Sequence, residues 1–267
     1  MLKLSIIGAG RVGQTFGRLF ADSKLFQIDA VCNQSIESAQ KAVEFIGQGR
    51  VVGLLHELSE SDVYLIATSD SQISAIAKAL TESVDLTGKI VFHCSGALSS
   101  TELGYGDFHK ASIHPVKSFA DPRLAINDFA GTYCGVEGDQ EALVILKPIF
   151  EQLGGNCFDI ASEMKQVYHA GAVFASNFLP LLVEASLKCY AKSGVNRDVA
   201  KQIIEPIIRL TLENSLKLEP KTALTGPVAR GDYQAVERQF QSLQENLPEL
   251  AELYDLLSEN LSNLLLK

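Results

Sequence analysis

A glycine-rich segment, GAGRVG at residues 8–13, is the feature that most constrains how this chain can fold. It follows the apolar run LKLSII and precedes QTFGRLFADS, whose apolar residues have helical spacing. Between a strand and a helix, Gly8 permits a tight turn, Gly10 lets the backbone approach a pyrophosphate, and Gly13 allows close packing. A glycine turn that binds nothing is the alternative. We favour a dinucleotide-binding loop, in which the contacts come from Gly8, Ala9, Gly10, Arg11, Val12 and Gly13.

Two further apolar runs end in polar residues that would meet at one edge of a parallel sheet. SDVYLIATSD exits at Thr68, Ser69 and Asp70, and GKIVFHCSG exits at Ser95. Ligands bind at the carboxyl ends of parallel strands. We therefore expect Thr68, Ser69 and Asp70 to contact the cofactor and Ser95 to contact a substrate.

Strand and helix patterns alternate as far as residue 160, which predicts a doubly wound α/β domain with a Rossmann-type parallel sheet over residues 1–160. HKASIHPV and GTYCGVEG read as strands added to this sheet. His114, held before a proline at the end of the first added strand, is a candidate to line the site. His93 reads instead as a buried, hydrogen-bonded core residue.

The end of the second predicted strand, QIDAVCN, indicates which dinucleotide is preferred. NAD-specific sites place Asp or Glu there to hold the ribose 2′-hydroxyl, whereas this strand runs into Asn33 and Ser35. Both side chains can donate hydrogen bonds to a 2′-phosphate, and Arg11 adds positive charge. The missing carboxylate, which would repel that phosphate, favours NADP. Ser35 is also a suitable helix N-cap, and the two roles are compatible.

From residue 161 the pattern changes to long helices, which predicts an all-helical domain over residues 161–267. A helix advances about 100° per residue. On the first helix, predicted over 163–192, Lys165, His169 and Ser176 therefore form a polar row, with Asn177 beside them. This row is either solvated or the wall of a ligand cleft. An apolar stripe, predicted to be the core face, lies opposite and contains Val167, Ala170, Phe174, Phe178 and Leu181.

Later segments add two further candidates. A second helix, predicted over 198–217 with a kink at Pro206, carries Asn214 on its apolar face, where a buried amide needs a partner. The turn-rich loop ALTGPVARGD contains Arg230, which suits a carboxylate clamp. Pairing of Arg230 with Asp232 is the alternative. Two closing helices end in leucines that suit packing or a dimer surface.

Composition narrows the partners of this chain. A net charge of −9 argues against nucleic acid or an anionic membrane as the main partner. Five scattered cysteines lack zinc spacing and no histidine pair has metal-ligand spacing, so we expect no metal and a reducing, cytoplasmic location. The longest apolar region, 170–185, is interrupted by polar residues and Pro180, which argues against a membrane span.

Five segments resemble a bacterial family over nearly the whole chain: IIGAGRVG, FHCSGALSS, SIHPVKSFA, KQVYHAGAVFASNF and ALTGPVARGD. Members join a Rossmann-like NADP-binding domain to a helical C-terminal domain long labelled as of unknown function, and some serve as alternative ketopantoate reductases. The family is similar in plan to ketopantoate reductases, β-hydroxyacid dehydrogenases and deazaflavin-dependent NADP reductases. The resemblance implies NADPH-dependent reduction of a small anionic keto acid, with ketopantoate (2-dehydropantoate) in pantothenate biosynthesis as the leading substrate.

The resemblance also implies roles for individual residues. Lys165 matches a lysine that faces the nicotinamide in the related reductases, so it is the first candidate for the catalytic group, as general acid or as electrostatic stabiliser. His169 stands where they have Asn and is the second candidate for the proton donor. Related enzymes pair through the helical domain, which implies a homodimer through the C-terminal helices. The candidate substrate-binding residues are Ser95, His114, Ser176, Asn177, Asn214 and Arg230.

Three other functions stay open at this point. The first is a cyclic-imine reductase of the pyrroline-carboxylate kind, which shares the expected architecture. The second is a deazaflavin:NADP oxidoreductase. The third is a regulator that binds NADP without catalysing a reaction.

Overall fold

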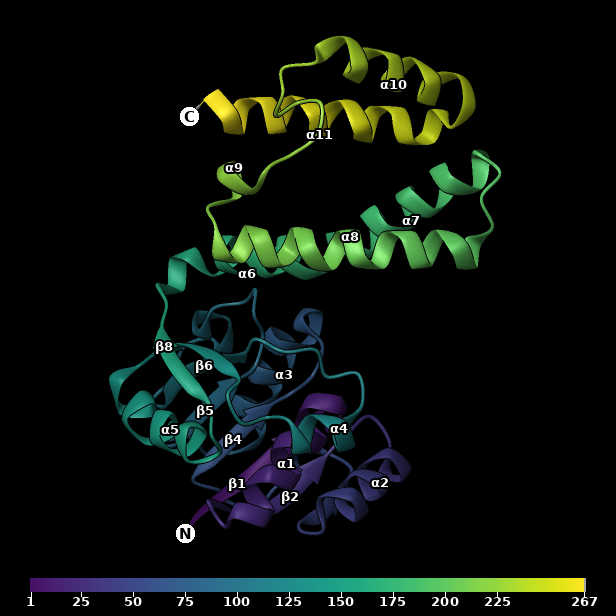
Figure 1. Ribbon diagram of the computed structural model, residues 1–267. Coiled ribbons are helices and arrows are strands. Elements are labelled where there is room, and N and C mark those ends of the chain that lie inside the picture. The colour runs from purple at the N-terminus through teal and green to yellow at the C-terminus, as the bar shows by residue number, and fades with distance from the viewer. Residues whose placement is uncertain (267) are drawn as a thin grey trace. The chain divides into compact units, whose positions relative to one another are not determined.

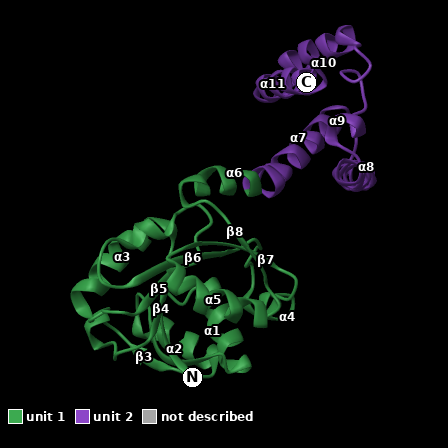
Figure 2. Ribbon diagram, turned by 90° about the vertical axis from the view of Figure 1, so that its left-hand side faces the viewer, with its two compact units in different colours: residues 1–172 green, residues 173–267 purple. Residues whose placement is uncertain are grey.

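The computed structural model describes residues 1–266 and divides the chain into two compact units. The first unit covers Met1–Ala172, and the second begins at Val173 (Figure 2). The division falls within helix α6 (Lys165–Ser176), later than the boundary at residue 160 expected from the sequence. The start of α6 belongs to the first unit because the side chain of Lys165 is buried there and hydrogen-bonds to Ser95.

The first unit is built on one eight-stranded sheet with the order β3-β2-β1-β4-β5-β6-β7-β8 (Figure 1). Neighbouring strands are parallel except β6 and β7, which are antiparallel. The strand order reverses between β1 and β4, so a topological switch point lies between them. The predicted doubly wound Rossmann-type fold is confirmed. The strands are β1 (Leu2–Ile7), β2 (Phe26–Cys32), β3 (Arg50–Val52), β4 (Val63–Ile66), β5 (Ile90–His93), β6 (His109–Pro115), β7 (Tyr133–Gly138) and β8 (Asn156–Asp159).

Helices cover both faces of this sheet. Helices α1, α2 and α5 contribute to the core on one face, and α3 contributes to the core on the other. Because both faces are covered, every residue of β4 and β5 is buried, which explains why their sequences are mostly apolar. The helical segments of this part are α1 (Arg11–Ser23), α2 (Ile36–Ile46), α3 (Asp70–Ser83), α4 (Pro122–Asn127), α5 (Gln140–Gln152) and the 3₁₀ turns η1 (Leu55–Glu57), η2 (Ser100–Leu103) and η3 (Ser162–Met164).

The C-terminal part is helical, as predicted, and the helix predicted over 163–192 is divided into α6 and α7. The division falls at Asn177, which keeps a helical backbone conformation and donates its N–H to the Val173 carbonyl oxygen at 2.8 Å. Pro180 has no N–H to donate to the carbonyl of Ser176, so one helical hydrogen bond is missing where α7 begins. The second long helix, α8, stays a single helix through Pro206. The remaining helices are α7 (Phe178–Lys192), α8 (Arg197–Lys217), α9 (Pro220–Ala223), α10 (Tyr233–Asn246) and α11 (Pro248–Leu266).

The apolar stripe that was predicted to be a core face is exposed. Val167 is 66% exposed and Phe174 is 72% exposed, whereas Lys165 of the polar row is 1% exposed. The two faces of α6 are thus interchanged relative to the prediction. The reason is that buried oxygen atoms at the sheet edge need hydrogen-bond donors. Lys165 supplies them, whereas an apolar face would leave these oxygens without partners.

The second unit has a small core. Its fully buried cluster consists of Leu187, Ala200 and Ile204, where α7 packs against α8. Helices α10 and α11 form a separate pair. A cavity of about 440 Å³ lies between α7 and this pair, lined mainly by leucines together with Cys189, Tyr190 and Tyr254. Apolar surface therefore stays uncovered within this unit.

Candidate functional site

The glycine loop has the geometry that its sequence predicts. Gly8 has a φ of +85°, and a Cβ placed on it would lie 2.8 Å from the backbone nitrogen of Thr68, so only glycine fits this turn. A Cβ on Gly13 would lie 2.6 Å from the Gly8 carbonyl oxygen, which explains how α1 packs so closely behind β1. By contrast, a Cβ on Gly10 would meet nothing within 4 Å. The space beside Gly10 is open.

This open space fits a dinucleotide phosphate. Helix α1 begins here with no side chain capping its first N–H groups and no acidic residue in its first turn, which leaves these donors for an anion. Ala9 is buried and Val12 packs against the core, so the loop offers its backbone to a ligand. The Thr68 hydroxyl is the one buried side-chain polar atom of residues 1–266 without a hydrogen-bond partner. Such an orphan costs about 1–3 kcal/mol, and a bound cofactor would satisfy it.

The residues expected to select the dinucleotide follow β2. Asn33 is half-buried, and Ser35 is exposed. The Ser35 hydroxyl accepts a hydrogen bond from the Ser38 N–H at 3.2 Å and caps α2, which confirms its predicted N-cap role. Arg11 is exposed at the start of α1. Contact of these side chains with a 2′-phosphate stays a prediction.

Two other expected cofactor contacts lie where α3 begins. Ser69 is the N-cap residue of α3, Asp70 is its first residue, and both are exposed. They follow β4, the neighbour of β1 across the switch point. Their position at the carboxyl edge of the sheet agrees with the prediction, and their contact with a cofactor stays a prediction.

The side chain of His93 holds the backbone of the loop that follows β5. Its Nδ1 accepts the N–H of Ser95 at 3.1 Å, and its Nε2 lies 3.1 Å from the carbonyl oxygen of Ser99. Because a carbonyl oxygen only accepts, Nε2 carries the proton. Burial, assisted by the nearby charge of Lys165, lowers the pKa of His93 to about 4. His93 is thus the neutral, hydrogen-bonded core histidine that the sequence predicted.

Ser95 is buried, and its hydroxyl has partners within its own loop. It accepts hydrogen bonds from the N–H groups of Ala97 at 3.2 Å and Leu98 at 3.0 Å. Its carbonyl oxygen faces the other way and accepts from Lys165. The hydroxyl therefore holds the loop in shape, and its predicted contact with a substrate stays a prediction.

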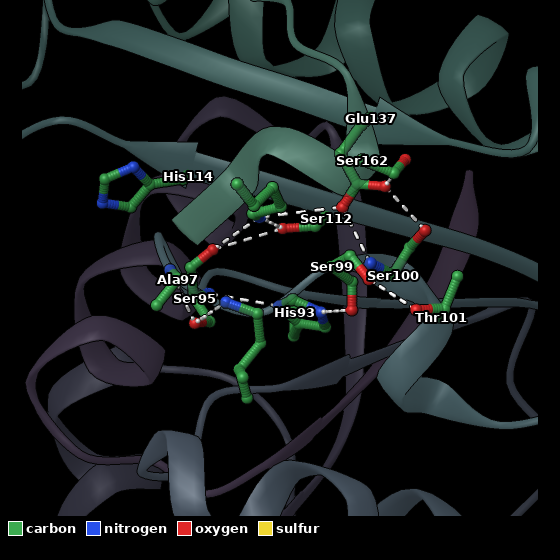
Figure 3. Close-up of polar contacts among 12 residues, drawn as sticks. His93, Ser95, Ala97, Ser99, Ser100, Thr101, Ser112, His114, Glu137 and Ser162 are labelled. Atoms are coloured by element: carbon green, nitrogen blue, oxygen red, sulfur yellow. Dashed lines mark hydrogen bonds and ion pairs between the residues drawn. The ribbon is translucent and has the colours of Figure 1, made fainter. Parts of the chain in front are cut away.

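Lys165 lies in a buried polar network rather than in an open cleft. Its Nζ donates to the Ser95 carbonyl oxygen at 2.8 Å and to the Ser112 hydroxyl, and it lies 3.6 Å from Oε1 of Glu137. Glu137 is 3% exposed and also accepts from the N–H and hydroxyl of Ser100, both at 2.8 Å (Figure 3). The Ser162 hydroxyl donates to the same carboxylate at 2.5 Å. The network joins β5, β6, β7, η2 and the start of α6.

These contacts bear on the role expected for Lys165, which stays a prediction. Two protein oxygens accept hydrogen bonds from its Nζ, and the Glu137 carboxylate lies within ion-pair distance, so the ammonium already has partners inside the protein. Burial lowers the pKa of Lys165, and the Glu137 carboxylate opposes that shift. A buried ammonium must be paired in this way, which is why its surroundings support a positioning role rather than contact with the reacting carbonyl.

Two histidines stand beside this network at the sheet edge. His114, near the end of β6, and His169, one turn after Lys165, have ring centroids 5.9 Å apart. A Cβ on Gly96 would lie 2.7 Å from Nε2 of His114 and 2.4 Å from Cδ2 of His169. The backbone of the β5 exit therefore approaches both rings closely only because residue 96 has no side chain. The structure brings together four predicted residues: Ser95, His114, Lys165 and His169.

The other predicted substrate contacts lie on the C-terminal helices and their loops. The Ser176 hydroxyl donates to Oδ1 of Asn177 at 2.7 Å, and Asn214 is half-buried on α8. Arg230 is exposed, and the Asp232 carboxylate accepts from the N–H of Ala235 and caps α10. Within residues 1–266 no ion pair joins Arg230 to Asp232, so that alternative is wrong. Contact of these side chains with a substrate stays a prediction.

Sequence reasoning missed Ser112, Glu137 and Tyr168. An acidic residue inside an apolar strand was the available signal for Glu137, since a buried carboxylate requires partners. The Tyr168 hydroxyl lies 2.9 Å from Nδ1 of His114, and a Cβ on Gly135 would come within 2.8 Å of that hydroxyl. No local sequence pattern predicts this contact. Over the described residues, no three His, Cys, Asp or Glu side chains gather into a metal site.

Two family models match successive parts of the chain. A Rossmann-like domain matches residues 1–104, and the Domain of unknown function (DUF2520) matches residues 132–261. No curated protein matches the sequence. Protein TM1727 from Thermotoga maritima is 30% identical, with a TM-score of 0.76 and 98% of each chain covered.

Two more distant structures share the fold. A protein described as an NADP oxidoreductase, from Bacteroides fragilis, is 23% identical, with a TM-score of 0.78 and 98% of each chain covered. The pyrroline carboxylate reductase of Plasmodium falciparum, solved with NADP bound, is 13% identical with a TM-score of 0.58. That match covers 99% of this chain and 98% of the other.

Proposed function

Because this chain belongs to the family that joins a Rossmann-like domain to the Domain of unknown function (DUF2520), we propose that it is an NADPH-dependent reductase of a small keto acid. One observation carries the proposal. A single sheet edge holds the uncapped glycine loop, the orphaned Thr68 hydroxyl and the two histidines beside Gly96. The first two suit a dinucleotide, and the third suits a reacting carbonyl next to it.

The residues of this edge would have different roles in the reaction. The backbone of residues 8–13 would hold the pyrophosphate, and Thr68 and Ser69 would lie near the nicotinamide. NADPH supplies the hydride when it is bound. Reduction places negative charge on the substrate oxygen, so hydrogen-bond or proton donors must lie about 3 Å away. We assign proton donation to His169, and Lys165 contributes positive charge from behind Ser95.

Ketopantoate is the substrate we favour. The resemblance of five segments to a family that includes alternative ketopantoate reductases supports this choice. Its carboxylate needs donors, which Asn177, Asn214 and Arg230 would provide. The pyrroline carboxylate reductase from Plasmodium falciparum, similar in fold over the whole chain, supports a cyclic imine as the second candidate.

Measuring NADPH oxidation against a panel of substrates tests this function. The panel contains ketopantoate, other 2-keto acids, 1-pyrroline-5-carboxylate and an oxidised deazaflavin. We expect ketopantoate to accelerate NADPH oxidation and the gene to relieve pantothenate auxotrophy in a host that lacks its own reductase. Turnover of the imine alone would transfer the assignment to imine reduction, and reduction of the deazaflavin would identify a deazaflavin:NADP oxidoreductase. Tight NADPH binding with no turnover of any compound would identify a regulator.

We also infer that the active form is a cytoplasmic homodimer paired through the C-terminal helices. By length and composition, residues 162–192 could cross a membrane. Only 6% of the 18-residue apolar window within this segment is buried. A second copy would cover these apolar side chains and fill the space beside Leu182 and Tyr190. Sedimentation at micromolar concentration should therefore show a species larger than the 28.9 kDa chain.

A further inference from the structure

Tyr168 and His114 form a directed pair at the candidate site. The phenol oxygen of Tyr168 lies 2.9 Å from Nδ1 of His114, and the two rings meet edge to face with centroids 5.6 Å apart. The ring of Phe158 also packs against the Tyr168 ring, with centroids 6.1 Å apart, and Gly135 leaves room for the Tyr168 hydroxyl. The phenol is thus held from several sides against one particular nitrogen.

The direction of this hydrogen bond follows from the partners that each group has. Among the described residues, the phenol hydroxyl contacts no acceptor other than Nδ1 of His114. If Nδ1 carried the proton, the phenol proton would have no acceptor in a partly buried place, at a cost of about 1–3 kcal/mol. Burial raises the pKa of Tyr168 to about 12, so the phenol keeps its proton. The phenol therefore donates and Nδ1 accepts.

The same environment keeps His114 uncharged. Burial, followed by the charges of Lys165 and His169, lowers the pKa of His114 to about 4. A neutral imidazole that accepts at Nδ1 must carry its proton on Nε2. Nε2 is the atom that lies against Gly96, on the side where His169 also stands.

We propose that Tyr168 is a positioning residue that fixes His114 in the Nε2–H tautomer, so that His114 donates a hydrogen bond to the substrate oxygen. This inference rests on the proposed reductase function for its substrate and on the structure alone for the tautomer. His114 keeps its proton throughout, because a neutral imidazole is too weak an acid to give it up. It stabilises the negative charge on the oxygen, while the proton that completes the alcohol comes from His169.

Two-bond ¹H–¹⁵N spectra of the full-length protein test the tautomer directly. They show which ring nitrogen of a neutral histidine carries the proton, and His114→Gln identifies the His114 signals. We expect His114 to be Nε2–H in the unmodified protein and to become a mixture of tautomers in Tyr168→Phe. Steady-state kinetics with NADPH and the best substrate should show kcat lowered about tenfold in Tyr168→Phe, the loss of one hydrogen bond. Tyr133→Phe, which removes an exposed phenol in contact with the same Phe158, should change neither measurement.

Three results would overturn the proposal. One is an Nδ1–H tautomer of His114 in the unmodified protein, which decides the matter even if Tyr168→Phe does not fold. Another is an unchanged Nε2–H signal in folded Tyr168→Phe. The third is an equal fall of kcat in the Tyr133 and Tyr168 variants. If no panel compound is turned over, the spectra still test the tautomer, so failure of the proposed function is recognised separately.

Discussion

Lys165 and Glu137 are two charges that each need the other, because both are almost fully buried. Lys165→Met removes the ammonium and leaves the carboxylate inside the protein without its counter-charge. We expect the free energy of unfolding to fall by about 3–5 kcal/mol, the typical result of breaking a buried pair. The double variant Lys165→Met/Glu137→Gln should lose clearly less than the sum of the two single variants.

Urea unfolding measures these changes, and the exposed pair of Lys188 and Glu249 provides the control. Lys188 is 43% exposed and its partner 52% exposed, so Lys188→Met should cost at most about 1 kcal/mol. The contradicting result is a Lys165→Met variant that is as stable as the unmodified protein but has a kcat that is lower by about 10²-fold or more. Lys165 would then be the catalytic group that the sequence-based assignment made it.

Single residues were predictable where one local pattern dictates them. Gly8 and Gly13 follow from the turn they must form, and His93 follows from its place at the end of a buried strand. Glu137 and Tyr168 were missed because their partners, Ser100 and His114, are distant in the sequence. Such pairs exist only once the sheet has brought β5, β6, β7 and α6 together.

The strand–loop–helix element at residues 2–23 makes a separate prediction, because two of its glycines serve different purposes. Gly8→Ala forces a side chain onto a φ of +85° and against Thr68, so the variant should be strongly destabilised. Gly10→Ala meets no protein atom, so its stability should fall by no more than about 1 kcal/mol, the usual difference between glycine and alanine at an N-cap. Its Cβ should nevertheless occupy the phosphate space and weaken NADPH binding at least about tenfold, or 1.4 kcal/mol.

Thermal unfolding and NADPH titration of the two variants separate these effects. A Gly10→Ala protein that binds NADPH as tightly as the unmodified protein would show that the open space beside Gly10 is not the phosphate site. Loss of stability in Gly10→Ala comparable with that of Gly8→Ala would contradict the described geometry of the loop.

Helix α6 shows what an amphipathic pattern does and does not determine. Its periodicity correctly separated a row containing Lys165 and His169 from a row containing Val167 and Phe174. Periodicity does not say what each face will meet, and the apolar row was wrongly assigned to the core. The division into α6 and α7 at Asn177 was not predicted, although Pro180 was visible, because the proline was interpreted only as an interruption of a possible membrane span.

At the scale of the whole molecule, the alternation of strands and helices was sufficient to predict the sheet, because the glycine fingerprint anchors its first strand. The division of the chain depends instead on which side chains α6 buries. Lys165 draws the start of this helix into the first unit, so the division lies at Ala172 rather than at residue 160. Assembly is also a property of the whole molecule, and the small core around Leu187 is the reason to expect a partner copy.

The claim on which the account rests is that this chain binds NADP(H) through its 2′-phosphate, and calorimetric titration with NADPH and NADH tests it most directly. We predict that NADPH binds at least about tenfold more tightly, a difference of about 1.4 kcal/mol. Ser35→Asp keeps the N-cap of α2, since Asp caps as well as Ser, and adds a carboxylate beside the phosphate. It should therefore weaken NADPH binding selectively and leave the melting temperature unchanged. Equal dissociation constants for NADPH and NADH in the unmodified protein would contradict the account.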